Sequence, residues 1–135
     1  MARSGVTIYH NPRCGKSRAT LALLRERGIE PVMVEYLRAP PEAKTLAKLL
    51  DMLQKSPRDL MRKHEPAYKD LGLDDPSLSR AALIAAMTAN PILIERPIVV
   101  AGGRAVLGRP PEAILEVLWR GLMGRIYFSL TNFAT

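Results

Sequence analysis

The chain has 135 residues, 47% of them hydrophobic, a length that fits a single ordinary domain. No apolar run approaches the roughly 18 residues that a membrane-spanning helix needs, so we expect no membrane span. The 20 Lys and Arg residues outnumber the 13 Asp and Glu residues, and the net charge of +7 attracts anions of many sizes. Aromatic residues make up only 5% of the chain and the arginines are scattered singly, so nucleic-acid binding is not expected.

The first 37 residues are predicted to form a strand, a helix and a second strand. Residues 6–10 are rich in β-forming side chains and end at the turn signal Asn11-Pro12. Apolar residues recur at helical spacing over residues 15–27, and Gly28 follows as a stop signal. Residues 32–37 predict the second strand, which a right-handed crossover would place parallel to the first.

The centre of the chain is predicted to be helical. Pro40-Pro41-Glu42 opens a helix that carries a row of leucines on one face: Leu46, Leu49, Leu50 and Leu53. Ser56-Pro57 is typical of the cap and first turn of another helix. Residues 63–76 are polar and turn-rich, and residues 77–90 predict a further helix that ends at Asn90-Pro91.

A hairpin and a last helix are predicted at the end. Residues 97–101 and 104–107 are apolar runs joined by Gly102-Gly103, which is typical of a β-hairpin. Residues 109–112 lead into a last helix that runs from Ala113 to about Trp119, and we expect the following tail to be frayed or a partner contact. The order predicts an α/β fold with one mixed sheet, built as βαβ and then ββα, with an inserted helical block.

Cys14 is the residue best placed for chemistry, since it follows the first predicted strand and begins the first predicted helix. Free N–H groups and the positive end of a helix favour the thiolate, the reactive form of cysteine. A lone cysteine is more often a small buried hydrophobe. Here its neighbours are polar or turn-forming instead: Asn11, Pro12, Arg13, Gly15, Lys16 and Ser17. We therefore expect a nucleophile, which His10 either tunes or merely neighbours as a polar residue at a strand end.

The cysteine count also bears on location. One cysteine cannot form an internal disulfide, and a free thiol persists best in a reducing compartment. The first apolar stretch is interrupted at Tyr9 and His10, which is not typical of a secretory signal peptide. We therefore expect a cytoplasmic protein.

The loop His10-Asn-Pro-Arg-Cys14-Gly-Lys-Ser-Arg18 resembles the active-site loop of the glutaredoxin-linked bacterial arsenate reductases, the ArsC-like proteins. Later segments resemble further motifs of this family in the same order: residues 61–63, 65–68, 90–100 and 108–110. Several spaced motifs in register are more specific than one short motif. The resemblance covers about residues 6–118 and implies a thioredoxin-like fold with a helical insertion, as one domain over residues 1–135.

The resemblance implies that Cys14 is the nucleophile and that three arginines bind substrate, namely Arg62, Arg96 and Arg109. Guanidinium groups suit a tetrahedral oxyanion because they donate paired, charge-assisted hydrogen bonds. The resemblance also implies a cis peptide bond before Pro97. Supporting roles are expected for this proline and for the loop: His10, Asn11, Gly15, Lys16, Ser17 and Pro97.

The implied activity is reduction of arsenate to arsenite, with glutathione as co-substrate, glutaredoxin as electron donor, no bound cofactor and no metal. Position 17 is Ser, so the two-cysteine motif of thioredoxins is absent. Cys14 cannot be resolved internally, and the electrons must therefore come through an external thiol. We expect the protein to act as a monomer.

Three alternatives differ in what they require. A glutathione-linked thiol oxidoreductase of the same fold would use the same pocket for another substrate. A non-catalytic regulator that binds RNA polymerase would not need the three arginines. A phosphatase-like arsenate reductase would need an arginine at position 20, and this chain has Thr20 there.

Overall fold

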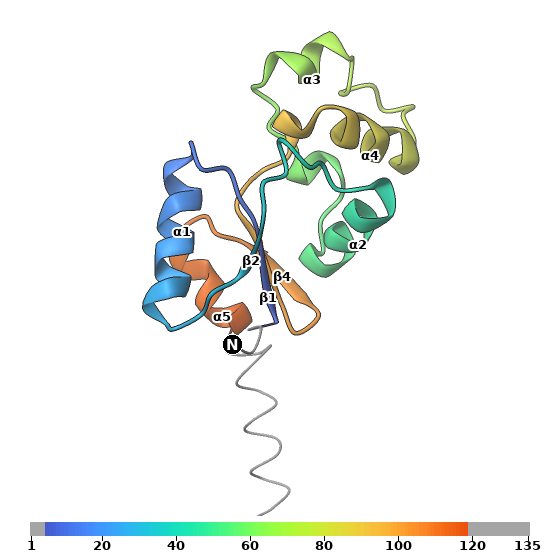
Figure 1. Ribbon diagram of the computed structural model, residues 1–135. Helices are drawn as coiled ribbons and strands as arrows, with labels where there is room; N and C mark the ends of the chain where they lie inside the picture. Colours follow the sequence, from blue (N-terminus) through green and yellow to red (C-terminus); the bar gives the residue numbers. More distant parts are fainter. Residues whose placement is uncertain (1–4, 119–135) are drawn as a thin grey trace, which may run out of the picture. The chain divides into compact units, whose positions relative to one another are not determined.

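The computed structural model describes residues 5–118, which divide between two compact units. The first unit combines residues up to Val34 with those from Arg96 onward, and the second spans Glu35–Glu95. The first contains the sheet, and the second is an inserted block of helices, as predicted (Figure 1). No helix of the described segment 5–118 is long and apolar enough to cross a membrane.

The sheet of the first unit has four strands in the order β2-β1-β3-β4. They are β1 (Val6–Tyr9), β2 (Val32–Val34), β3 (Ile98–Ala101) and β4 (Arg104–Leu107). β1 and β2 are parallel, whereas β3 is antiparallel to both β1 and β4. The predicted mixed sheet and hairpin are therefore confirmed.

β2 is shorter than the predicted strand over residues 32–37. The chain turns directly after the strand, because the carbonyl oxygen of Glu35 accepts from the N–H groups of Arg38 and Ala39 at 3.0 and 2.9 Å. Tyr36, which the prediction placed in the strand, is fully buried in the second unit instead.

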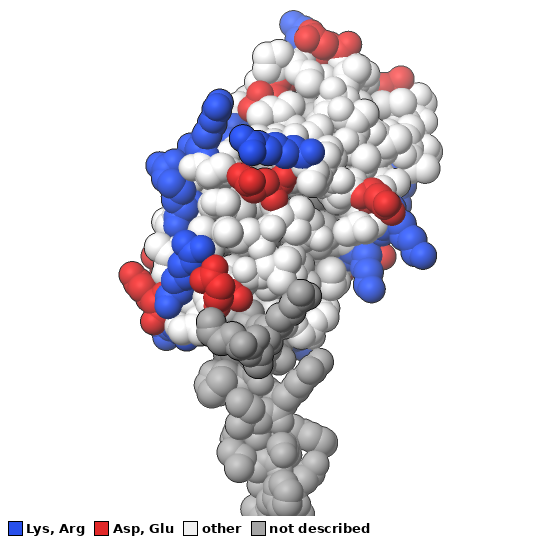
Figure 2. Space-filling view, in the orientation of Figure 1, with Lys and Arg blue, Asp and Glu red and all other residues white. Residues whose placement is uncertain are grey.

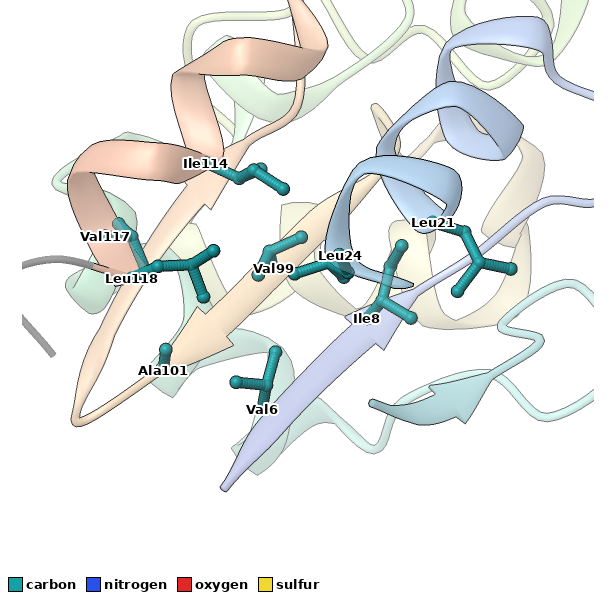
Figure 3. Close-up of a cluster of buried hydrophobic side chains, with 9 residues drawn as sticks. All are labelled: Val6, Ile8, Leu21, Leu24, Val99, Ala101, Ile114, Val117 and Leu118. Atoms are coloured by element: carbon teal, nitrogen blue, oxygen red, sulfur yellow. The ribbon is translucent and has the colours of Figure 1, made fainter. Parts of the chain in front are cut away.

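Two helices pack on one face of the sheet, as Figure 3 shows. They are α1 (Gly15–Glu26) and α5 (Ile114–Leu118), the latter preceded by the 3-10 helix η3 (Pro111–Ala113). The register places Val6 opposite Ala101 and Ile8 opposite Val99, so alternate residues of β1 and β3 form one apolar surface. The helices cover this surface with a set of buried side chains: Leu21, Leu24, Ile114, Val117 and Leu118.

The ends of these helices follow the local signals in part. α1 stops one residue before the predicted end, and Gly28 follows with a φ of 75° that favours glycine. The last helix was predicted from residue 113, but Pro111 begins a 3-10 turn before α5 starts at Ile114. Trp119 and the tail, predicted to be frayed or a partner contact, lie outside the described residues.

The second unit is held together by α2 (Ala43–Leu53) and α4 (Arg80–Ala89), which pack against each other. Each contributes one buried apolar row, and the six residues are Leu46, Leu49, Leu50, Leu83, Ile84 and Met87. α4 starts later than predicted because Ser79 is its N-cap, with the hydroxyl accepting from the N–H of Ala82 at 3.1 Å.

Two local predictions in this unit were wrong. Ser56-Pro57 precedes only the 3-10 helix η1 (Arg58–Leu60), since the Ser56 hydroxyl donates to the Asp59 carboxylate at 2.9 Å and caps no helix. The stretch predicted as polar turns contains a short helix, α3 (Pro66–Asp70), with Pro66 in its first turn. A further 3-10 helix, η2 (Pro91–Leu93), follows α4.

Candidate active site

Cys14 is the N-cap residue of α1, as the sequence predicts, and its side chain is partly exposed. Its backbone is extended, with φ −91° and ψ 124°, and its N–H donates to the carbonyl of Asn11 at 3.0 Å. The first N–H groups of a helix have no partner within the helix and form its positive end. The Cys14 thiol therefore lies at the positive end of α1.

The loop before Cys14 is organised by Ser17, whose side chain is fully buried. Its hydroxyl oxygen accepts from the N–H of Asn11 at 3.0 Å and lies 2.7 Å from Nδ1 of His10. Asn11 in turn accepts from the N–H of Arg13 through its side-chain oxygen at 3.0 Å. The structure thus brings together three of the predicted supporting residues and fixes the path of the chain into Cys14.

Replacing Ser17 with alanine is expected to destabilise the protein by about 1–3 kcal/mol, because the buried N–H of Asn11 would lose its acceptor. Chemical denaturation measured beside the wild type tests this expectation. Ser17→Thr keeps the hydroxyl and serves as the comparison. A loss below about 0.5 kcal/mol for Ser17→Ala would contradict the role assigned to this hydrogen bond.

Arg96 is a buried cation, and only 9% of the residue is exposed. Its Nε and Nη1 atoms are fully buried, and neither has a hydrogen-bond partner among residues 5–118. Burying a charged donor without an acceptor is costly, and buried polar groups are nearly always paired. A guanidinium held in this way is suited to receive an anion with several oxygen atoms.

Arg109 is linked to Arg96 through the backbone. Its Nη1 donates to the carbonyl oxygen of Arg96 at 3.2 Å, so the two predicted substrate-binding residues of the first unit lie next to each other. The bond between Arg96 and Pro97 is cis, which confirms the expectation drawn from the resemblance. The bond between Arg109 and Pro110 is also cis, which was not predicted from the sequence.

Gly108 joins this group to α1. Its N–H donates to the carbonyl of Pro97 at 2.9 Å, and a Cβ at this position would lie 2.5 Å from Oγ1 of Thr20 and 2.9 Å from Cγ of Pro97. Only glycine fits between these two side chains without a shift. The packing role of Gly108 and Thr20 was not predicted. Gly108 does, however, belong to residues 108–110, one of the segments that resemble the family's motifs.

Arg62 belongs to the second unit and lies on an extended segment, not in the helix that was predicted to follow Ser56-Pro57. The chain is extended here because Met61 pairs with Ile94 in an isolated bridge and the N–H of Arg62 donates to Leu93 at 2.7 Å. Arg62 therefore belongs to a different unit from Arg96 and Arg109.

The guanidinium of Arg62 has two side-chain partners that sequence reasoning missed. Nε donates to the Glu65 carboxylate at 3.1 Å, and Nη2 lies 3.1 Å from Nε2 of His64. Arginine only donates, so the contact is a hydrogen bond in the tautomer whose Nε2 accepts. The spacing of Glu65 three residues after Arg62 is the signal that could have suggested the pair.

The remaining loop residues are exposed. Gly15 opens α1 and Lys16 follows it, both at the surface. Figure 2 shows Lys and Arg side chains gathered along the edge of the molecule that α1 forms. The loop, α1 and its C-cap contain five cationic residues: Arg13, Lys16, Arg18, Arg25 and Arg27. Such a surface draws anions toward Cys14. Within residues 5–118, no group of three or more His, Cys, Asp and Glu side chains could hold a metal ion.

The strand order and the cysteine at the start of α1 define a protein of thioredoxin-like fold with a single cysteine in its loop. A sequence profile of the ArsC family matches residues 9–117, and the chain belongs to that family.

Individual relatives agree with this assignment. "Uncharacterized protein YfgD" of Escherichia coli K12 is 59% identical over 114 residues, which cover 84% of this chain and 96% of that protein. An arsenate reductase of Neisseria meningitidis is 50% identical over 117 residues, covering 84% of this chain and 97% of the relative. The solved structure of arsenate reductase from Vibrio cholerae has a TM-score of 0.84 at 50% identity, covering 87% of this chain and all of that one.

Proposed function

We propose that the protein is an arsenate reductase in which Cys14 attacks arsenate while Arg62, Arg96 and Arg109 bind its oxygen atoms. The observation that carries this proposal is the buried guanidinium of Arg96, which has two donors without an acceptor. Arg109 adds a second positive charge beside it. The relatives named arsenate reductase support the choice of arsenate among tetrahedral oxyanions.

The first step forms a bond between the Cys14 sulfur and arsenic(V). One arsenic–oxygen bond breaks, and that oxygen leaves as water once it is protonated. The position of Cys14 at the N-cap of α1 favours the thiolate that this step needs. The arginines neutralise the charge on the remaining oxygens, which lets an anionic nucleophile approach an anionic substrate.

The electrons come from external thiols, because the 135-residue sequence has one cysteine. Glutathione converts the adduct to a mixed arsenical that carries both sulfur atoms, with loss of a second water. A glutaredoxin thiol then attacks the glutathione sulfur; a mixed disulfide forms, and the electron pair of the broken sulfur–arsenic bond reduces arsenic(V) to arsenic(III). Hydrolysis releases arsenite and regenerates Cys14. Such chemistry belongs to a reducing compartment, the cytoplasm.

A coupled assay tests the proposal. The protein is incubated with arsenate, glutathione, glutaredoxin, glutathione reductase and NADPH, and the loss of NADPH is followed. We expect consumption that requires both arsenate and glutaredoxin, and a loss of at least about 1,000-fold in Cys14→Ser, because a hydroxyl is a far weaker nucleophile than a thiolate.

Two results would contradict the proposal. Activity retained in Cys14→Ser would exclude this cysteine as the nucleophile. A wild type that ignores arsenate but reduces glutathione conjugates would favour the glutathione-linked oxidoreductase instead, whereas a protein without any thiol activity that binds RNA polymerase would favour the regulator.

A further inference from the structure

The guanidinium of Arg62 is held by two side chains of its own turn. Nε donates to the Glu65 carboxylate at 3.1 Å, and Nη2 lies 3.1 Å from Nε2 of His64. Nη1 has no hydrogen-bond or ion-pair partner among residues 5–118. On the basis of the proposed function, in which Arg62 binds arsenate, we propose that Glu65 is a positioning residue. It fixes the guanidinium through Nε and leaves Nη1 available to an oxygen atom of the anion.

The ion pair between Arg62 and Glu65 is largely shielded from water. The exposed fraction is 15% for the Arg62 side chain and 20% for the Glu65 side chain. In the pair of Arg80 and Asp51 in the same unit, these fractions are 45% and 77%. Exposed pairs contribute little, because water and salt screen the charges and long side chains stay mobile. The shielded pair is therefore the one that can keep an arginine in a single conformation.

Arg58 shows what an arginine with a structural role does in this unit. Its Nε donates to the carbonyl of Leu73 at 2.9 Å, a residue 15 positions away, and its Nη2 donates to the carbonyl of Asp75. These bonds join separate segments of the chain. Both side-chain partners of Arg62 lie within three residues of it, so they join no distant segments.

The backbone of Arg62 is fixed without the ion pair. Its N–H donates to the carbonyl of Leu93 at 2.7 Å, and the preceding residue, Met61, forms a bridge with Ile94. The path of the chain through this segment is thus set by backbone pairing. What the Glu65 carboxylate adds is the place of the guanidinium.

The start of α3 does not account for a glutamate at position 65. Glu65 is the N-cap residue of this helix, but its carboxylate makes no capping hydrogen bond to the helix. Short side chains such as Ser and Asp are preferred at an N-cap, because they reach the first N–H groups. The backbone N–H of Glu65 donates to the carbonyl of Arg62 at 3.1 Å and closes the turn that brings the two side chains together.

Positioning should act on binding of the anion. An arginine side chain has many rotamers, and one that is fixed before the anion arrives loses less entropy on binding. The reaction at the Cys14 sulfur does not involve Glu65. We therefore expect its removal to change the KM for arsenate and to leave kcat largely unchanged, as loss of uniform binding does.

The test compares two variants of Glu65 in the coupled assay. Glu65→Ala removes the acceptor of Arg62 Nε, whereas Glu65→Gln keeps an oxygen acceptor and removes the charge. Glu65→Ala should raise the KM for arsenate at least about fivefold, with kcat and the KM for glutathione within about threefold. Glu65→Gln should keep all three values within about threefold of the wild type. Asp51→Ala removes the carboxylate of an exposed ion pair in the same unit and is the matched control.

Three outcomes would overturn the inference. A smaller rise of the KM in Glu65→Ala would show that Arg62 needs no support. An equal rise in Glu65→Gln would show that the charge matters and the hydrogen bond does not. A KM that falls in both variants would show that the carboxylate competes with the anion for Arg62.

NMR of the arginine side chains gives a readout that needs no activity. The Nε–H signal of Arg62 is assigned by its loss in Arg62→Lys. Its exchange with water should be at least about tenfold faster in Glu65→Ala and within about threefold of the wild type in Glu65→Gln. Unchanged exchange in Glu65→Ala would refute the proposed hold on Nε.

Circular dichroism shows whether each variant has folded. If Glu65→Ala does not fold, Glu65→Ser replaces it in every measurement, with the same expected results. Serine is a preferred N-cap residue, and its side chain is two carbon atoms shorter than that of glutamate.

Calorimetric titration with inorganic phosphate separates the inference from the proposed function. Phosphate binding at least about fivefold weaker in Glu65→Ala, and restored in Glu65→Gln, would uphold the positioning role even in a protein that does not reduce arsenate. Arsenate reduction with the same KM for arsenate in Glu65→Ala and the wild type would uphold the reaction and reject the positioning role.

Discussion

Replacing Arg96 with methionine should raise the free energy of unfolding by about 1–2 kcal/mol and lower arsenate reduction by about 100- to 1,000-fold. The two effects have opposite signs because the guanidinium is buried with two donors that lack an acceptor in the folded protein. Methionine fills similar volume and has no charge to desolvate. Thermal and chemical denaturation measure the first effect, and the coupled assay measures the second.

Arg104→Met is the matched control, since Arg104 lies in the hairpin that follows Arg96 and is exposed. The equilibrium constant of unfolding and the rate of arsenate reduction should each stay within about twofold of the wild type in Arg104→Met. Phosphate or arsenate should raise the melting temperature of the wild type and of Arg104→Met, but not that of Arg96→Met, because a ligand stabilises only the state that binds it. A lower stability of Arg96→Met would show that the guanidinium is part of the scaffold.

Replacing Gly108 with alanine should destabilise the fold by about 2–3 kcal/mol, because the added methyl group overlaps its neighbours. The new Cβ would lie 2.5 Å from Oγ1 and 3.1 Å from Cγ2 of Thr20, and 2.9 Å from Cγ of Pro97. Rotating the Thr20 side chain about χ1 relieves little of this overlap, because a β-branched residue then turns another heavy atom toward the new methyl group. Activity should fall as well, because Arg109 is the next residue.

A double-mutant cycle with Thr20→Ala isolates the cause. Removing Oγ1 and Cγ2 of Thr20 eliminates two of the three close contacts, so the double variant should lose at least about 1 kcal/mol less than the sum of the single variants. Strictly additive losses in chemical denaturation would show that the effect of Gly108→Ala does not arise from contact with α1.

The features that the sequence predicted well are those set by nearby residues. The two-glycine turn identified the hairpin, and the polar loop placed Cys14 at the start of α1. The parallel pairing of β1 and β2 also followed from one short crossover. In these cases the neighbouring side chains and the backbone preferences favour the same conformation, so local patterns suffice.

The features that were missed depend on contacts between distant parts of the chain. Met61 is extended because it pairs with Ile94, 33 positions later, and no local signal near Arg62 reports that partner. The approach of Gly108 to Thr20 has the same origin. The end of β2 is instead a local turn at Glu35, which the β-forming side chains of residues 32–37 did not indicate. The roles of the three arginines rest on the family resemblance and stay predictions.

The hairpin of β3 and β4 carries Arg96-Pro97 immediately before it and Gly108-Arg109 immediately after it. Ile98 pairs with Leu107 at that end, and Ala101 pairs with Arg104 at the other, next to the Gly102-Gly103 turn. The spacing of the two cations is therefore set by strand pairing and not by the turn. An inserted tag or dye at the turn should therefore leave the site undisturbed. One residue added within either strand would instead reverse the faces of the strand residues on one side of the insertion and shift their pairing with the partner strand.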